Sequence, residues 1–144
     1  MPLNSFRSQL YKKIINNKKK YVYYPLAIYW IFLIAATSFP SESLPSFGVN
    51  DKIEHLSAYF ILAVFFSLTL FLQTKKLLLK KYWNQYSVII LLIYGIFDEV
   101  HQYFIPGRFF DWLDLLANFS GIVLGVYLIR KYFVIPLQKE INFL

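Results

Sequence analysis

The chain has no cysteine among its 144 residues. This absence excludes disulfide bonds, thiolate nucleophiles and metal or iron–sulfur sites built on cysteine. It does not identify the cellular compartment. Internal repeats and low-complexity segments are also missing, and charged residues make up only 16% of the chain. The length and the lack of repeats indicate a single domain.

Apolar side chains, in contrast, are abundant. Hydrophobic residues form 58% of the chain, and its mean hydropathy is +0.47. A soluble core of this size cannot bury so much apolar surface, whereas about 20 apolar residues cross a bilayer as one helix. Four stretches have that length, at residues 21–39, 53–72, 83–105 and 112–133. We therefore predict an all-α fold, an integral membrane bundle of four transmembrane helices joined by short loops.

Acidic residues are few, eight against 15 basic ones, and the two kinds are separated along the chain. Seven of the eight acidic residues fall at one end of the predicted bundle, and only Glu140 falls at the other. Thirteen basic residues fall at that other end: Arg7, Lys12, Lys13, Lys18, Lys19, Lys20, Lys75, Lys76, Lys80, Lys81, Arg130, Lys131 and Lys139. Basic residues accumulate on the cytoplasmic side of membranes. This pattern predicts both termini in the cytoplasm, with the chain in the cytoplasmic (inner) membrane.

The first apolar stretch has an alternative interpretation as a cleaved signal peptide. A basic leader precedes it, and Ala36-Thr37-Ser38 is a faint cleavage signal. The apolar run is longer than the core of a usual signal peptide. A retained first span is therefore the expectation.

Residues 1–20 form a basic segment before the four-helix domain at residues 21–133, and residues 134–144 form a short cytoplasmic tail. Leu3, Phe6, Leu10 and Ile14 recur at helical spacing in the basic segment. This spacing favours an amphipathic helix on the inner leaflet, and a disordered tail that only sets the topology is an equal alternative. No aromatic platform accompanies the lysines, so we expect no binding of nucleic acid.

Polar residues interrupt the predicted spans in three places, all at the non-cytoplasmic end. They are Asp51, Lys52, Glu54 and His55; Asp98, Glu99, His101 and Gln102; and Arg108, Asp111, Asp114 and Asn118. A helix rises ~1.5 Å per residue, which puts the last two groups at comparable depths. We predict that the three groups converge on one polar site.

The fourth span also carries a continuous stripe, because residues three or four apart share a helix face. The stripe runs through Asp111, Asp114, Asn118, Gly121 and Gly125. Its polar half is expected to line the site. Its two glycines should let a neighbouring helix of the bundle approach closely.

Carboxylates outnumber cations at this site. Six carboxylates face only Lys52 and Arg108 before histidine is counted. Such a surplus cannot stay dry and ionised, so the sequence predicts hydration, protonation, histidine pairing, or a bound cation or cationic substrate. The surroundings are rich in oxygen, which would suit Mg²⁺, Ca²⁺ or Mn²⁺ better than zinc. A divalent cation is therefore a candidate cofactor.

The motifs resemble the VanZ-like family of small bacterial integral membrane proteins. The family pattern places Lys-x-x-His-x-x-x-Tyr at the start of one span. Later, Asp-Glu-x-x-Gln leads through Pro-Gly-Arg to Asp-x-x-Asp-x-x-x-Asn-x-x-Gly. Here the matching segments read DKIEHLSAY from Asp51 to Tyr59 and DEVHQYFIPGRFFDWLDLLANFSG from Asp98 to Gly121. The resemblance covers the last three predicted spans.

The resemblance implies a multi-pass protein of the bacterial cell envelope, related to resistance to glycopeptide antibiotics of the teicoplanin type. We expect a site that acts on or binds a lipid-linked envelope component. The acid–base candidates are His55, Asp98, Glu99 and Asp114. The substrate-binding candidates are Lys52, Tyr59, Gln102, Arg108, Asp111 and Asn118.

Each of these roles has a structural alternative. His55 is a metal ligand or general base, or a histidine held in a structural hydrogen-bond network. Arg108 is a clamp for a phosphate or carboxylate, or the partner of Asp98, Asp111 or Asp114 in an ion pair. Glu99 lies beside the predicted inner face of its span, and its alternative is a side chain in contact with solvent. His101 lies on another face and is expected at the surface.

Three function classes follow for the whole chain. The first is a membrane enzyme, although no arrangement of a nucleophile and its base is evident. The second is a non-catalytic scaffold or partner subunit whose polar cluster is structural. Transport ranks last, because four spans are few for an alternating-access carrier. The lipid bilayer is the expected partner, and a lipid-linked envelope substrate or a membrane protein is a further candidate. The sequence does not decide whether the chain forms homo-oligomers.

Overall fold

The computed structural model describes residues 6–40 and 50–142, with the side chains of 140–142 left aside. Leu3 of the predicted amphipathic segment and the last two residues of the predicted tail lie outside the described residues. The chain runs through α1 (Phe6–Asn16), η1 (Lys19–Tyr23), α2 (Tyr24–Ser38), α3 (Asp51–Leu72), α4 (Leu77–Lys81), α5 (Trp83–Tyr103), α6 (Trp112–Ile129), η3 (Arg130–Val134) and α7 (Ile135–Asn142). The described residues contain no strand, which confirms the all-α prediction.

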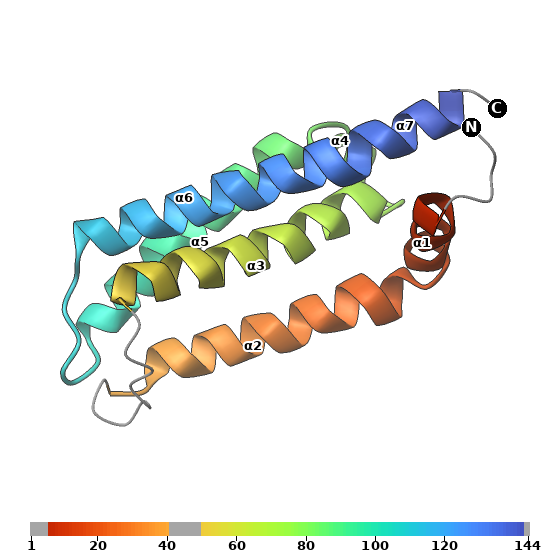
Figure 1. The fold of residues 1–144 in the computed structure, drawn as a ribbon. Coiled ribbons are helices and arrows are strands. Elements are labelled where there is room, and N and C mark those ends of the chain that lie inside the picture. The colour runs from red at the N-terminus through yellow and green to blue at the C-terminus, as the bar shows by residue number, and fades with distance from the viewer. Residues whose placement is uncertain (1–5, 41–49, 143–144) are drawn as a thin grey trace.

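Four long helices, α2, α3, α5 and α6, run alongside one another, and α1 lies at the end of the bundle that also holds α4 and α7 (Figure 1). Tyr11 of α1 contacts η3 at this end of the bundle. Its hydroxyl donates to the Tyr132 carbonyl oxygen at 2.8 Å, and its ring packs edge-on against Phe133.

Local sequence signals set the helix starts at the opposite end. The Asn50 side chain accepts a hydrogen bond from the Lys52 amide at 2.9 Å and caps α3. Asp111 caps α6 in the same way, through the Leu113 amide at 2.8 Å. Between α5 and α6 the chain turns at Gly107, whose φ of 77° suits glycine and few other residues. These caps fix the residues at which α3 and α6 begin.

The α3–α6 pair is the most extensive helix contact in the fold. Gly121 and Gly125 of α6 make it close. A Cβ atom added at Gly121 would overlap the Leu56 carbonyl oxygen, and one at Gly125 would lie 2.8 Å from the Phe60 carbonyl oxygen. The predicted close approach at these glycines is confirmed, and it occurs within the bundle.

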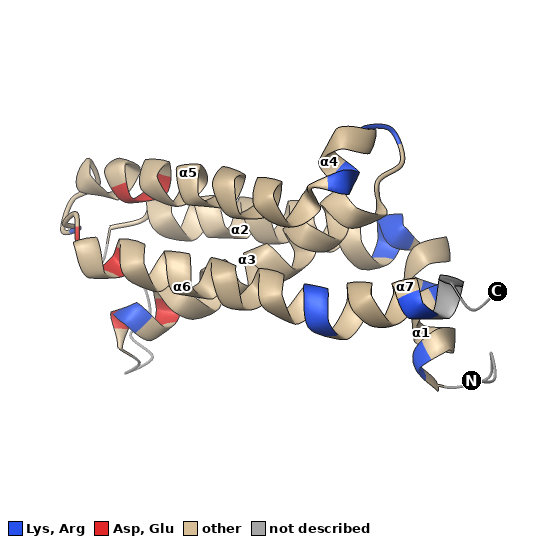
Figure 2. Ribbon diagram, turned by 90° about the horizontal axis from the view of Figure 1, so that it is seen from above, with Lys and Arg blue, Asp and Glu red and all other residues tan. Residues whose placement is uncertain are grey.

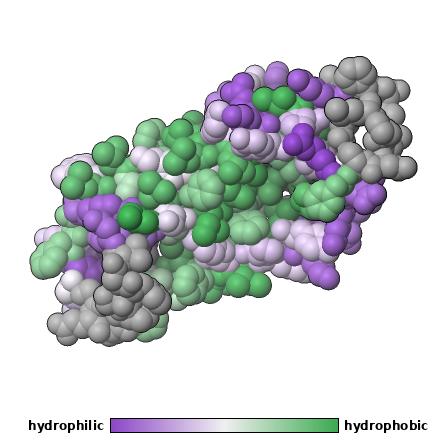
Figure 3. Space-filling model, in the orientation of Figure 1, coloured by the Kyte–Doolittle hydropathy of each residue, from purple (hydrophilic) through white to green (hydrophobic). Residues whose placement is uncertain are grey.

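A hydrophobic band separates the two hydrophilic ends of the molecule (Figure 3). Large apolar side chains on α2 lie exposed in this band, among them Ile28, Ile31 and Phe32. Such a wide apolar surface belongs in lipid. The protein is therefore a multi-pass membrane protein in contact with the bilayer.

Of the described helices, three are long and apolar enough to cross a membrane: Lys19–Ser38, Asp51–Leu72 and Trp112–Lys139. Three of the four predicted spans thus coincide with candidate membrane-spanning helices, and the fourth stays a prediction. α5 is of similar length, 21 residues, but it carries Asp98, Glu99 and Gln102, whose side chains are buried. These polar residues lower the mean hydropathy of α5, although their side chains are buried within the bundle.

Charge divides the bundle in the way that the sequence indicates. Lysine and arginine mark the end with α1, α4 and α7, whereas aspartate and glutamate mark the far end of α3, α5 and α6 (Figure 2). Among the few basic residues at the acidic end are Lys52 and Arg108, and both take part in the site described next.

Candidate functional site

The predicted site residues meet at the acidic end of the bundle. They come from the first turns of α3, the last turns of α5, the α5–α6 turn and the first turns of α6. Side-chain contacts join them as Lys52 with Asp111 and Asp114, His55 with Asn118, Tyr59 with Asp98, Glu99 with Asp111, and Arg108 with Gln102. The structure therefore brings all of these residues into one polar region, and their chemical roles stay predictions.

Lys52 is the central cation of this region. Its Nζ lies 2.5 Å from Asp114 Oδ1, 2.6 Å from Asp111 Oδ2 and 3.5 Å from Asp51 Oδ2. Asp114 is buried, whereas Asp51 and Asp111 reach solvent. The Lys52 ammonium, together with the Leu113 amide, holds the pKa of the Asp111 carboxyl below its ordinary value. One ammonium thus ties α3 to the start of α6.

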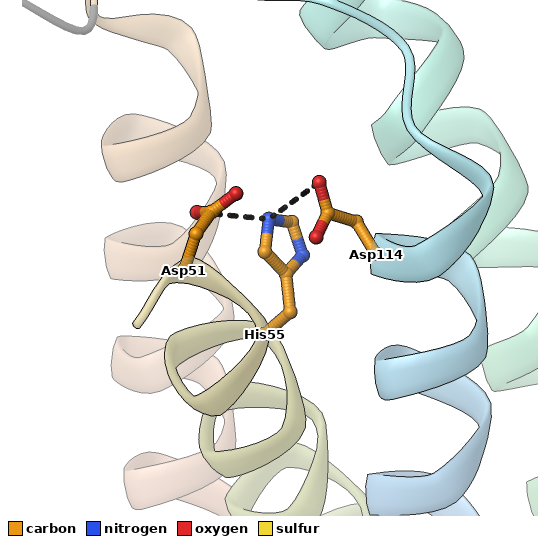
Figure 4. A group of neighbouring side chains, drawn as sticks. All are labelled: Asp51, His55 and Asp114. Atoms are coloured by element: carbon orange, nitrogen blue, oxygen red, sulfur yellow. Dashed lines mark ion pairs between the residues drawn. The ribbon is translucent and has the colours of Figure 1, made fainter. Parts of the chain in front are cut away.

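His55 follows Lys52 on α3 and is mostly buried. Its Nδ1 lies 3.1 Å from Asn118 Oδ1. Its Nε2 lies 3.7 Å from Asp51 Oδ1 and 3.9 Å from Asp114 Oδ2, distances beyond a hydrogen bond (Figure 4). The three side chains offer ligand atoms that all lie within 4.8 Å of one another. Asp51 is outside the predicted ligand-binding set, although its spacing of four residues from His55 puts both on one helix face.

Tyr59 and Asp98 form a buried pair between α3 and α5. The Tyr59 hydroxyl donates to Asp98 Oδ2 at 2.8 Å, and Tyr59 is fully buried. The ring of Tyr59 also lies over Gly95, where a Cβ would be 3.3 Å from Tyr59 Cε1. Gly95 and Asp98 therefore lie on the face of α5 that meets α3.

We expect Tyr59→Phe to lower stability by about 1.5–3 kcal/mol, because the buried Asp98 carboxylate loses a hydrogen-bond donor. The melting temperature of the purified protein in detergent should fall by roughly 5 °C. Tyr103→Phe is the matched control, since Tyr103 is 63% exposed on the same helix as Asp98. Equal melting of the two variants would contradict a structural role for the Tyr59 hydroxyl.

Glu99 corrects one expectation. It is 1% exposed and not solvated. Its Oε1 accepts a hydrogen bond from the Asp111 amide at 2.9 Å, while its Oε2 has no hydrogen-bond partner among the described residues. The Nδ2 atom of buried Asn118 also lacks one there. His101, in contrast, is exposed, as predicted.

For Arg108, the described residues do not show the ion pair that was one of its two alternatives. Within residues 6–40 and 50–142 it forms no ion pair with Asp98, Asp111 or Asp114. Its guanidinium group instead donates to Gln102 Oε1 at 2.9 Å and to the carbonyl oxygens of Ala36 and Phe39 at 3.1 and 3.2 Å. After the turn at Gly107, the Arg108 side chain contacts the backbone at the end of α2. The carboxylates of Asp111 and Asp114 pair with Lys52 instead.

A pocket of about 740 Å³ lies between α2 and α3 beside the polar region. Its walls are mostly apolar and include Phe32, Leu33, Ala36 and Ala58. Its polar lining consists of Tyr29, Thr37, Asp51, Glu54, His55, Tyr59, Asp98 and Arg108. Of the predicted site residues, His55, Tyr59, Asp98 and Arg108 thus face the pocket. No sequence pattern indicated the α2 wall, which contributes apolar side chains to the pocket and backbone carbonyl oxygens that bind Arg108.

A sequence model of the VanZ/LLP1 family matches residues 8–135, which is most of the chain. No curated protein and no solved structure matches it significantly.

Proposed function

The chain belongs to the VanZ/LLP1 family, and on that premise we propose that it binds a lipid-linked envelope component at the polar end of its bundle. The ligand's polar head would meet Arg108 and His55, and its apolar chain would lie along α2. The single observation that carries this proposal is the pocket, which joins these polar side chains to apolar walls.

The size and lining of the pocket fit such a ligand. Ligand sites commonly measure about 300–1,000 Å³ and combine apolar walls with a few polar groups, and the 740 Å³ pocket lies in that range. Phe32 and Ala35 line it and are exposed at the surface of α2. An acyl or prenyl chain bound there has a path to the surrounding bilayer.

Arg108 supports an anionic head group. Its described partners are the neutral Gln102 side chain and two carbonyl oxygens. Its positive charge is therefore not matched by a carboxylate within the described residues. A phosphate or carboxylate could bind this guanidinium in bidentate fashion.

The membrane arrangement in this proposal has four spans, with both termini in the cytoplasm of a bacterial cell. α5 supplies the fourth span. Its outward face carries exposed Ile89, Ile93, Ile96 and Phe97, while Asp98, Glu99 and Gln102 are buried. The basic end with α1, α4 and α7 faces the cytoplasm. The polar site then faces outward, where glycopeptide antibiotics act on cell-wall precursors, and we extend the proposal to susceptibility to teicoplanin-type compounds.

Chemistry on the bound head group would fall to the acid–base candidates His55 and Asp98, which line the pocket. Glu99 and Asp114 would act behind them. The alternative is a non-catalytic scaffold or partner subunit, which the Lys52 and Tyr59 contacts favour because they tie α3 to α6 and to α5.

Blocking the pocket tests the proposal. Ala58→Phe places a large ring inside the pocket, whereas Ser57→Phe adds the same ring at an exposed neighbouring position. We expect the unmodified protein in detergent to retain a radiolabelled polyprenyl phosphate. Ala58→Phe should weaken retention by about tenfold or more, because overfilling costs about 1–3 kcal/mol, and Ser57→Phe should retain the lipid.

Arg108→Gln separates the head group from the chain in the same assay. It should weaken retention of polyprenyl phosphate and leave retention of the uncharged polyprenol unchanged. Expression of the same variants in a teicoplanin-susceptible bacterium should rank them in the same order. Equal retention by Ala58→Phe and Ser57→Phe would leave the scaffold alternative standing.

A further inference from the structure

We propose that Asp51, His55 and Asp114 bind one divalent first-row transition-metal cation. The inference goes beyond the lipid site and needs no lipid to be bound. Its ligand atoms are Asp51 Oδ1 and His55 Nε2 on α3 and Asp114 Oδ2 on α6 (Figure 4).

The spacing of these atoms fits a shared ion. His55 Nε2 lies 3.7 Å from Asp51 Oδ1 and 3.9 Å from Asp114 Oδ2. Two ligand atoms on one zinc-sized ion stand roughly 3.0–3.4 Å apart, given bonds of about 2.1 Å at octahedral or tetrahedral angles. The two distances from His55 Nε2 exceed this spacing by a few tenths of an ångström, and the two carboxylate oxygens, which lie within 4.8 Å of each other, would move closer together on an ion.

The tautomer of His55 also fits. The Asn118 side-chain carbonyl oxygen, 3.1 Å from His55 Nδ1, can only accept a hydrogen bond, so this contact favours the tautomer with the proton on Nδ1. In neutral imidazole the lone pair is then on Nε2, which faces the two carboxylates. A partner that fixes the distal nitrogen in this way is the usual support of a metal-binding histidine.

Lys52 leaves the required oxygens free. Its Nζ forms ion pairs with Oδ2 of Asp51 and with Oδ1 of Asp114. The other oxygen of each carboxylate, Oδ1 of Asp51 and Oδ2 of Asp114, faces His55. Each carboxylate can thus serve Lys52 with one oxygen and an ion with the other. Asp51, Asp111 and Asp114 together exceed the charge of Lys52 by two, which a divalent cation would neutralise.

A second observation comes from buried groups that lack partners next to this cluster. Glu99 Oε2 and Asn118 Nδ2 have no hydrogen-bond partner among the described residues, and both side chains are at least 98% buried. Glu99 bonds to the backbone of Asp111, and Asn118 bonds to His55. A water molecule on the ion would supply the hydrogen-bond donor that the glutamate oxygen lacks.

The donor set selects among metals. One imidazole nitrogen with two carboxylate oxygens suits Mn²⁺ or Zn²⁺, whereas Ca²⁺ prefers six to eight oxygen ligands. The order of affinity for such sites puts Zn²⁺ above Mn²⁺. We therefore expect Zn²⁺ to displace Mn²⁺ from the site and Ca²⁺ not to do so.

The test uses the full chain in detergent, with any histidine tag removed and metal stripped by chelator. Mn²⁺ alone is titrated and followed by the loss of the free-ion electron paramagnetic resonance signal. We expect one ion per chain. Asp51→Asn and His55→Gln should each weaken binding by at least tenfold, while Glu54→Gln and His101→Gln should bind as the unmodified protein does.

Asp51→Asn keeps the proposal testable where folding is a concern, because Asp51 is 61% exposed at its side chain. Its circular dichroism and melting without metal should match those of the unmodified protein. Binding by Asp51→Asn and His55→Gln that equals binding by the two controls would overturn the proposal, and so would absence of Mn²⁺ and Zn²⁺ binding. Retention of polyprenyl phosphate is measured separately on the metal-stripped protein, so that failure of the metal site is distinguished from failure of the lipid proposal.

Discussion

Replacing Gly121 with alanine should destabilise the bundle strongly, because the added methyl group has no space between α6 and α3. Its Cβ would overlap the Leu56 carbonyl oxygen and lie 2.9 Å from the Phe60 amide nitrogen. Both are backbone atoms, so no side chain can rotate away, and the helices must separate. We expect a cost of about 3 kcal/mol, the upper part of the usual range for overpacking.

Thermal melting of the purified variant in detergent measures this cost, with an expected fall of roughly 6–12 °C in melting temperature. Val123→Ala is the control, because Val123 is 41% exposed on the same helix, and it should melt close to the unmodified protein. A Gly121→Ala protein that melts with this control would mean that α3 and α6 pack more loosely than the structure shows.

Separation of these two helices should also disrupt the polar site. Lys52 and His55 lie on α3, and their partners Asp114 and Asn118 lie on α6. The same variant should therefore weaken binding of Mn²⁺ even in the fraction that stays folded. Packing at the glycines and geometry at the carboxylates are thus two parts of one helix contact.

Periodicity predicts this stripe of α6 well, because spacing alone fixes which residues share a helix face. Asp114, Asn118, Gly121 and Gly125 of the predicted stripe are buried in the structure, whereas its first residue, Asp111, is partly exposed. The partner helix does not follow from the spacing. It depends on the relative rotation and order of the helices, which the period of one helix does not contain.

The ion pairs show the same limit. The sequence places Lys52 and Arg108 at the end that carries the carboxylates, but it does not decide which cation takes them. The cap at Asn50 directs the first turn of α3 so that Lys52 reaches Asp111 and Asp114. The left-handed turn at Gly107 directs Arg108 toward α2. Both outcomes depend on loop geometry, which hydropathy and charge do not encode.

The pocket could not be predicted from the sequence, for a different reason. α2 carries no charged residue, and the contacts it makes with Arg108 come from backbone carbonyl oxygens. Backbone acceptors leave no trace in residue identity. The apolar side chains of α2 that line the pocket resemble those that face lipid elsewhere on the helix.

Replacing Lys52 with methionine should cost about 2–3 kcal/mol, since it leaves the buried Asp114 carboxylate without its cation. Breaking a fully buried pair costs about 3–5 kcal/mol, and the 33% exposure of the Lys52 side chain lowers this figure. Methionine keeps most of the apolar stem, so the loss reports the charge. Lys80→Met, at an exposed position of α4, should stay within about 0.5 kcal/mol of the unmodified protein.

A second substitution in the Lys52→Met background identifies which carboxylate causes the loss. Asp114 is 6% exposed at its side chain and Asp111 is 40% exposed. Asp111 can be hydrated once Lys52 is gone, whereas Asp114 cannot, so Asp114→Asn should restore more of the melting temperature than Asp111→Asn does. Asparagine at position 111 also keeps the oxygen that caps α6, so that a difference between the two rescues reports charge and not capping. Equal rescue by both would mean that attraction across the surface, and not burial of one carboxylate, is what Lys52 contributes to the fold.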